Sequence, residues 1–160
     1  MAKTKRKPYS ERSDLEKIKS QWKKTNGLLE RSEWSGAVVR AATAAELAAN
    51  HYIREELQNK RGLEKTLVDS MLRWANGIGG KFKNLIGPIS KENGTSKKIK
   101  ALSKQVTEIN NVRNSIVHQG QFKMDKTAIR VAKEAREVIH GLVNEHKPEF
   151  SLPKVKKLNK

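Results

Sequence analysis

An alanine-rich stripe that repeats every three or four residues is the feature that most limits what this chain can fold into. Its members lie between residues 34 and 53, and they are Trp34, Val38, Ala41, Ala45, Ala48 and Tyr52, with Ala42, Ala49 and Ile53 beside them. Such steps place apolar side chains on one face of an α-helix. Because alanine is small, other helices can approach this face closely. We therefore expect a long helix that ends before Gly62 and packs closely against other helices.

The same periodicity recurs along the chain. Ser13 and Glu16 form a capping-box pattern, in which each side chain satisfies a backbone N–H at a helix start, so a first helix begins there. Further helices are expected at about 63–78, at 96–117 and after Asp125. No segment shows the alternation of a half-buried strand. The predicted fold class is therefore all-α, an up-and-down bundle of four to five helices joined by short turns.

The length of 160 residues suits one domain. We predict a helical domain at 13–147, a basic flexible arm at 1–12 and a basic C-terminal tail at 148–160. Both end segments are expected to be solvated, with nucleic-acid binding as the alternative. Inside the domain, Gly87-Pro88 and Asn93-Gly94 are typical of turns.

The charge balance points to a polyanionic partner. Lys and Arg number 34 against 17 Asp and Glu, which gives a formal net charge of +17. A basic surface gains free energy when it releases the counterions condensed on phosphates, so nucleic acid is the expected partner. An anionic membrane surface is the weaker rival, because no apolar run approaches the length of a spanning helix. No membrane partner is expected.

Other residue types narrow the chemistry further. Cysteine is absent, which excludes disulfides, thiolate metal sites and cysteine nucleophiles from this sequence and fits a cytoplasmic location without a secretion signal. The four histidines lack the spacing of helical zinc sites, so neither a metal nor a cofactor is expected. His51 is expected to be a half-buried packing residue, with a substrate contact as the alternative. His140 and His146 are expected to face solvent.

The segment at 96–117 has two faces that predict different roles. Its apolar stripe, which must face the core, comprises Ile99, Leu102, Val106, Ile109 and Ile116. Its polar stripe comprises Lys97, Lys100, Lys104, Thr107, Asn111, Asn114 and His118. The second stripe could follow a phosphate backbone, so we expect Lys97, Lys100, Lys104 and Asn111 to bind RNA.

Arg113 falls within the apolar stripe. An always-charged guanidinium costs several kcal/mol when it is buried without a partner, so it must find an anion, reach water or lie where the core opens into a site. The structural alternative is an ion pair with a buried carboxylate, for which Glu46 on the alanine-rich helix is the candidate.

The stretch from Val112 to Gly120, Val-Arg-Asn-Ser-Ile-Val-His-Gln-Gly, resembles the signature of HEPN domains, which is Arg, a polar residue, three variable residues and His. The order of elements agrees over roughly 13–146, with long helices before the motif and another helix after it. The resemblance implies a HEPN-like bundle and a metal-independent endoribonuclease that works as a homodimer, with Arg113, Asn114 and His118 as its catalytic residues.

The resemblance also implies a role. Toxins and antiviral defence effectors are common in the family, so an antitoxin or other regulatory protein is a candidate partner beside RNA. In one branch a tyrosine two residues beyond the histidine is modified by a partner nucleotidyltransferase. Gly120 stands at that place here, so control of that kind is not expected.

The residues themselves suit RNA cleavage without metal. His118 can take or give a proton near neutrality, because an unperturbed imidazole titrates at about 6.5. Arg113 can bind the phosphate with two N–H groups, and Asn114 can orient the imidazole or the substrate. One chain offers one such histidine, whereas two chains offer a base and an acid.

One geometric question stays open at this stage. Residues five apart on an ideal helix differ in direction by roughly 140°, so Arg113 and His118 diverge unless the helix loosens near Val117, the arginine reaches around, or the two act from different chains. Two other functions also remain open, namely a non-catalytic RNA-binding module and a helical adaptor for an acidic protein partner.

Overall fold

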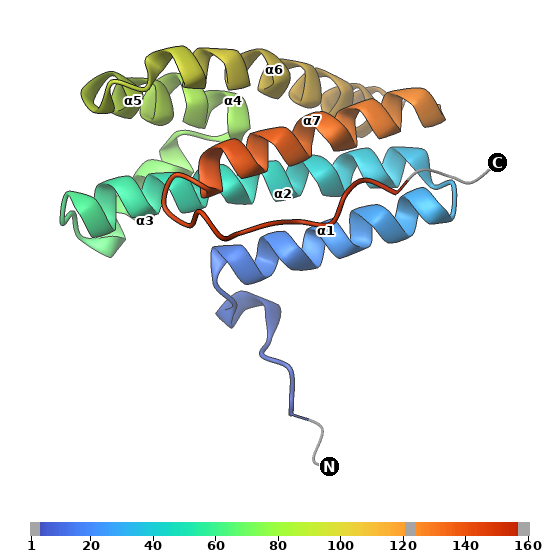
Figure 1. The fold of residues 1–160 in the computed structure, drawn as a ribbon, viewed down its shortest axis with the longest axis horizontal. Helices are drawn as coiled ribbons and strands as arrows, with labels where there is room; N and C mark the ends of the chain where they lie inside the picture. The colour runs from blue at the N-terminus through green and yellow to red at the C-terminus, as the bar shows by residue number, and fades with distance from the viewer. Residues whose placement is uncertain (1–3, 121–123, 157–160) are drawn as a thin grey trace.

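Four long helices form the body of the molecule. The computed structural model describes residues 4–120 and 124–156, and its long helices are α1 (Asp14–Glu30), α2 (Trp34–Arg54), α6 (Ser96–Gln119) and α7 (Asp125–Val143). Each runs opposite to the long helix before it (Figure 1). The described residues contain no strand. The all-α prediction is therefore confirmed.

The helix α2 is the centre of the core, because α1, α6 and α7 all pack against it. Its alanines at positions 37, 41, 44, 45, 48 and 49 are fully buried. The contact between α6 and α7 is also close, since a Cβ added at Gly141 would lie 2.7 Å from Cδ1 of Leu102. Small residues thus allow the helices to approach, as the alanine stripe predicts.

A chain of short elements connects α2 to α6. It comprises the π-helical turn η2 (Glu55–Lys60), α3 (Lys65–Trp74), α4 (Gly77–Lys81), the π-helical turn η3 (Phe82–Ile86) and α5 (Gly87–Asn93). The predicted turn at Gly87-Pro88 is wrong, because Pro88 occupies the first turn of α5, a position that proline tolerates. The chain reverses instead at Gly94, which has a φ of +71°.

The helix α3 buries only some of its apolar side chains. Leu67 and Trp74 are 50% and 70% exposed, whereas Val68 and Leu72 are buried. Leu63, just before the helix, and Met71 are partly buried against the core.

Both end segments are more ordered than expected. Residues Tyr9–Glu11 form the 3₁₀ helix η1, and the hydroxyl of Tyr9 accepts a hydrogen bond from Gln21 on α1. Residues 148–156, here called the C-terminal strap, run along α1 and α7 (Figure 1). Residues 1–3 of the predicted arm and 157–160 of the predicted tail lie outside the described residues.

The strap is held by both apolar and polar contacts, so the prediction of a solvated tail is wrong for residues 148–156. Phe150 and Leu152 are buried. The indole Nε1 of Trp22 donates to the carbonyl of Pro153 at 2.8 Å, and Arg136 donates to the carbonyl of Leu152 at 2.7 Å. Two buried apolar side chains offset the entropy of ordering such a segment.

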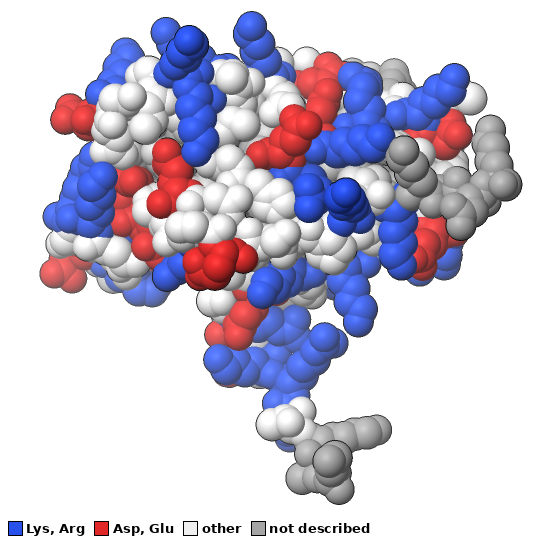
Figure 2. Space-filling model, viewed as in Figure 1, with Lys and Arg blue, Asp and Glu red and all other residues white. Residues whose placement is uncertain are grey.

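Positive charge is spread over the surface. Figure 2 shows Lys and Arg side chains across the whole of the visible face, with fewer Asp and Glu among them. A search of the described helices for one long and apolar enough to cross a membrane finds none.

Candidate functional site

The predicted RNA-binding residues lie together on α6. Lys97, Lys100, Lys104 and Asn111 are all exposed. At 100° per residue, their positions fall within about 60° of one another around the helix axis. They therefore form one polar face, which we call the α6 lysine face.

A groove borders this face and adds two lysines that the sequence pattern did not indicate. It has a volume of about 480 Å³ between α6 and the segment from α4 to α5. Lys83, Lys91 and Lys100 line it, and its other lining residues include Phe82 and Val106. Lys83 and Lys91 could not be assigned from sequence, because their place beside α6 depends on how the short elements pack.

Arg113 is half-buried on α6 and has no carboxylate partner among the described residues. Its Nη1 donates to Oδ1 of Asn114 at 3.3 Å. The structural alternative for Arg113 is wrong, because Glu46 pairs instead with Nζ of Lys81 at 2.9 Å. The guanidinium thus touches a neutral amide and keeps further N–H groups for another acceptor.

His118 lies in the last turn of α6, where it is exposed. The helix is regular up to Gln119 and ends at Gly120, which has a φ of +64°. The helix does not loosen near Val117, so Arg113 and His118 point about 140° apart. No hydrogen bond between described residues joins His118 to Arg113 or Asn114. The fold therefore brings Arg113 and Asn114 into contact, and places His118, one turn after Asn114, on the same side of α6 as Asn114 but away from Arg113.

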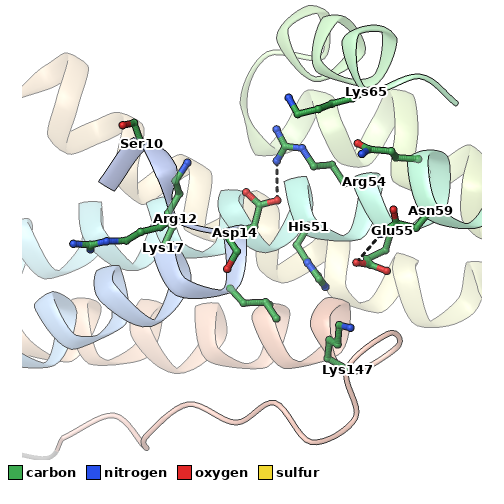
Figure 3. A pocket seen from close by; sticks show the side chains of 13 residues that line it. Ser10, Arg12, Asp14, Lys17, His51, Arg54, Glu55, Asn59, Lys65 and Lys147 are labelled. Carbon is green, nitrogen blue, oxygen red and sulfur yellow. Dashed lines mark hydrogen bonds and ion pairs between the residues drawn. The ribbon is translucent and has the colours of Figure 1, made fainter. Parts of the chain in front are cut away.

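An open cavity of about 490 Å³ has the buried His51 in its wall (Figure 3). The start of α1, the end of α2, η2 and Lys147 form its walls. His51 is only 6% exposed, and its Nε2 has no hydrogen-bond partner among the described residues. Burial lowers the pKa of this histidine below 6.5, so its ring is neutral at pH 7. Sequence spacing predicted the packing role of His51 but gave no sign of a cavity.

His140 and His146 do not face solvent, so the prediction that they would do so is wrong. Nε2 of His140 accepts a hydrogen bond from the backbone N–H of Leu152 at 3.0 Å. Burial lowers the pKa of His140, and the nearby Arg136 lowers it further. His146 lies 2.8 Å from Oε1 of Glu56. Both rings therefore hold segments together that are distant in sequence.

Glu56 is the centre of a buried polar cluster. Its side chain is 4% exposed and lies 2.6 Å from Nη1 of Arg61 and 3.4 Å from Nζ of Lys60. Burial raises the pKa of Glu56, but hydrogen bonds from Asn93, Arg61 and His146 outweigh burial and lower it to about 2. The cluster fixes η2 against the end of α7.

No group of three or more His, Asp or Glu side chains within residues 4–120 and 124–156 is placed to hold a metal ion. Comparison with models of known protein families, with curated proteins and with solved structures finds no match.

Proposed function

We propose that this chain is a metal-independent endoribonuclease of the HEPN type, acting as a homodimer in the cytoplasm as a toxin or antiviral defence effector. The observation that carries the proposal is Arg113, a half-buried guanidinium whose partner among the described residues is the neutral amide of Asn114. The net charge of +17 and the exposed α6 lysine face support RNA as the substrate.

Arg113 suits a phosphate because its own surroundings do not neutralise it. A guanidinium removed from water without an anion costs free energy. A phosphodiester supplies that anion and accepts two parallel N–H bonds from arginine. Asn114 Oδ1 takes one N–H at 3.3 Å and so limits the directions in which the guanidinium can lie. We expect Arg113 to oppose the charge that develops on the phosphate during cleavage.

The reaction follows from these groups. The 2′-hydroxyl oxygen attacks the adjacent phosphorus and passes its proton to a neutral imidazole. The bond from phosphorus to the 5′-oxygen breaks, and an imidazolium gives a proton to that oxygen. The products are a 2′,3′-cyclic phosphate and a 5′-hydroxyl. Two His118 side chains, one from each chain, supply the base and the acid.

A second copy of the chain would also allow Arg113 and His118, which point in different directions on α6, to act on one substrate. Because Arg113 and His118 point about 140° apart on α6, one phosphodiester is reached more readily by the arginine of one chain and the histidine of the other. Val117 and Met124 are 47% and 75% exposed near the same end of α6. A second copy would cover this apolar surface.

The test is RNA cleavage by the purified full chain in excess chelator. We expect Arg113→Ala and His118→Ala each to lower the rate at least about 100-fold, as loss of a charge-stabilising or proton-transferring group does. Arg130→Ala is the matched control, since it removes an exposed cation that pairs with Glu108 at 2.6 Å. Intact RNA with wild-type protein, or equal cleavage by all four proteins, would overturn the proposal.

A second candidate, RNA binding without cleavage, is favoured by one observation. The unbroken α6 keeps Arg113 and His118 of one chain apart, so a single chain offers binding groups without an assembled site. This function predicts salt-sensitive binding, intact RNA, and equal affinities for wild type and His118→Ala.

A further inference from the structure

The groove between α6 and the segment from α4 to α5 carries cations on both of its walls. Lys83 and Lys91 come from one wall and Lys100 from the other. All three residues are exposed, and none forms an ion pair with a described carboxylate. No Asp or Glu lines the groove, and the exposed Glu92 beside Lys91 is not one of its lining residues. The groove is therefore a strip of uncompensated positive charge.

The groove is narrow, because its walls are helical segments that pack against each other. The helices α4 and α5 both contact α6, and Figure 1 shows them alongside the first part of α6. Packed helices lie roughly 8–10 Å apart. Small residues line the space between them, among them Gly87, Ser90 and Ser103. Such a space admits one nucleic-acid strand but not a duplex, which is two strands wide.

The floor of the groove offers little apolar surface. Phe82, Ile99 and Val106 line it, but they are only 5%, 4% and 2% exposed. An amphipathic peptide needs exposed apolar surface in which to insert its anchors. The hydroxyl-bearing residues Ser96 and Thr107 line the groove beside the lysines. Ammonium and hydroxyl groups bind phosphate oxygens. The lining therefore favours a sugar–phosphate backbone over a peptide.

One end of the groove leads toward the proposed cleavage site. This end is marked by Gly79, where an added Cβ would lie 3.9 Å from Nδ2 of Asn110. Asn110, Asn114 and His118 follow one another at intervals of four residues, so they form a row along one side of α6. Asn114 also contacts Arg113. A strand that leaves the groove along this row reaches His118 about 12 Å beyond Asn110.

We propose that this groove holds one strand of RNA by its sugar–phosphate backbone and directs that strand along α6 to His118. Lys83 and Lys91 contact its phosphates from one side, and Lys100 contacts them from the other. The bases face away from the groove, so binding is independent of base sequence. The proposal rests on the proposed function for the choice of RNA as partner.

The test is fluorescence anisotropy of the full chain with a labelled 2′-O-methyl oligouridylate of about eight nucleotides, a length within the site sizes of single-strand-binding proteins. Its methylated 2′-oxygen cannot attack phosphorus, so this strand stays intact whether or not the chain is a nuclease. The charge variant combines Lys83→Gln with Lys91→Gln. Its matched control combines Lys133→Gln with Lys154→Gln, which removes two exposed lysines that do not line the groove.

A second pair of variants fills the groove without changing any charge. Ser103→Leu adds an apolar side chain to the groove wall. Ala101→Leu adds the same side chain to an exposed position of α6 that points about 160° away from Ser103. Leucine is a good helix former, so both variants should keep α6 intact.

We expect the charge variant to bind at least tenfold more weakly than wild type. It should also reduce the slope of log K against log salt by about 1.4, since each of two lost phosphate contacts on a single strand contributes about 0.7. Ser103→Leu should bind at least tenfold more weakly, while both controls stay within about threefold of wild type. An oligoadenylate should bind like the oligouridylate, and a duplex of the same length at least tenfold more weakly.

The proposal is overturned if the charge variant binds as tightly as its control, or if Ser103→Leu binds as tightly as Ala101→Leu. Equal binding of the duplex, or of an oligoglutamate peptide of the same length, would also overturn it. Cleavage of unmodified RNA in excess chelator is measured separately. If wild type cleaves and the charge variant has the same KM, the groove proposal fails and the nuclease stands. Groove binding without cleavage has the opposite meaning.

Discussion

Glu56 shows how much a single buried carboxylate can hold together. It contacts Lys60 and Arg61, which follow α2 in the chain, and His146, which follows α7. Because Glu56 is buried, it is the acceptor of hydrogen bonds from Asn93, Arg61 and His146, whereas its cationic partners Lys60 and Arg61 still reach water.

We predict that Glu56→Ala lowers the free energy of unfolding by about 3 kcal/mol, because it removes the charged acceptor of several hydrogen bonds. Glu108→Ala is the control, since the pair of Glu108 with Arg130 is more exposed and should contribute less than about 1 kcal/mol. Urea unfolding of both variants measures the difference. Equal losses would contradict the prediction.

Glu56 also makes the stability of the folded chain depend on pH in the acidic range. The pKa of Glu56 is lowered to about 2 in the folded chain, against an ordinary value of 4.5. Its contribution to stability is therefore present above about pH 4.5 and is lost as the pH falls toward 2. The pH profile of unfolding for Glu56→Gln should be flatter than that of wild type in this window.

The lowered pKa of His140 predicts a second, smaller dependence of stability on pH. Because its pKa in the folded chain lies below 6.5, the unfolded chain takes up the proton more readily, and stability falls as the pH drops below about 6.5. Protonation of Nε2 also removes the acceptor for the N–H of Leu152. We expect the exchange protection of the Leu152 amide to fall as the pH drops below about 6.5. In His140→Gln, whose amide oxygen can still accept, protection should stay constant, and identical profiles would contradict the assignment.

At the scale of elements, α6 has an apolar inner face and a basic outer face. Ile99, Val106 and Ile109 are buried on its inner face, while its lysines project from the outer face. Its rigidity follows from packing against α7 and the segment from α4 to α5. Such a helix fixes the positions from which the lysine side chains extend, while their exposed ammonium groups keep their freedom to move.

We predict that replacing Lys97, Lys100 and Lys104 together by Gln weakens RNA binding and flattens its salt dependence. Three lost phosphate contacts on a single strand should reduce the slope of log K against log salt by about 2. Replacing Lys19, Lys23 and Lys24 on α1 removes the same charge and is the matched control. Equal changes in the two triple variants would show that only net charge matters.

The sequence predicted those elements whose signals are local. The capping box of Ser13 and Glu16 forms as expected, with the N–H of Ser13 donating to Glu16 at 2.8 Å. The alanine stripe and the α6 stripe also bury the predicted faces. The strap could not be predicted, because Phe150 and Leu152 are isolated apolar residues without a periodic pattern, and the strap is held in part by Trp22, which bonds Pro153 more than a hundred positions away.

In the candidate sites, too, local spacing predicted some features, whereas others depend on contacts between distant parts of the chain. The exposed positions of Lys97 and His118 follow from spacing along one helix, and so does the divergence of Arg113 from His118. The cavity at His51 joins α1, α2, η2 and Lys147, so no local pattern indicates it. Nor could spacing show that Glu46 binds Lys81 rather than Arg113, since Lys81 lies 35 positions away on a short helix whose placement depends on tertiary packing.

At the scale of the whole molecule, the proposed nuclease requires two chains, which gives a direct test. We predict that an excess of about tenfold of His118→Ala, mixed with wild-type chain and left to exchange subunits, lowers the cleavage rate of the wild-type chain about tenfold, because most wild-type chains then lie in mixed dimers that hold one His118 and lack either the base or the acid. The control is the same excess of Arg130→Ala, which keeps His118 and should not lower the rate. A rate unchanged by His118→Ala would contradict cleavage by two histidines from two chains.

The C-terminal strap ties the last part of the chain to the first helix. The indole N–H of Trp22 reaches its acceptor only when the carbonyl of Pro153 is in place. On the ribosome, the groove along α1 must therefore stay open to water while more than a hundred later residues are translated. Protein synthesis thus sets the order of assembly. The helices α1 and α2 pair early, and the C-terminal strap covers Trp22 last.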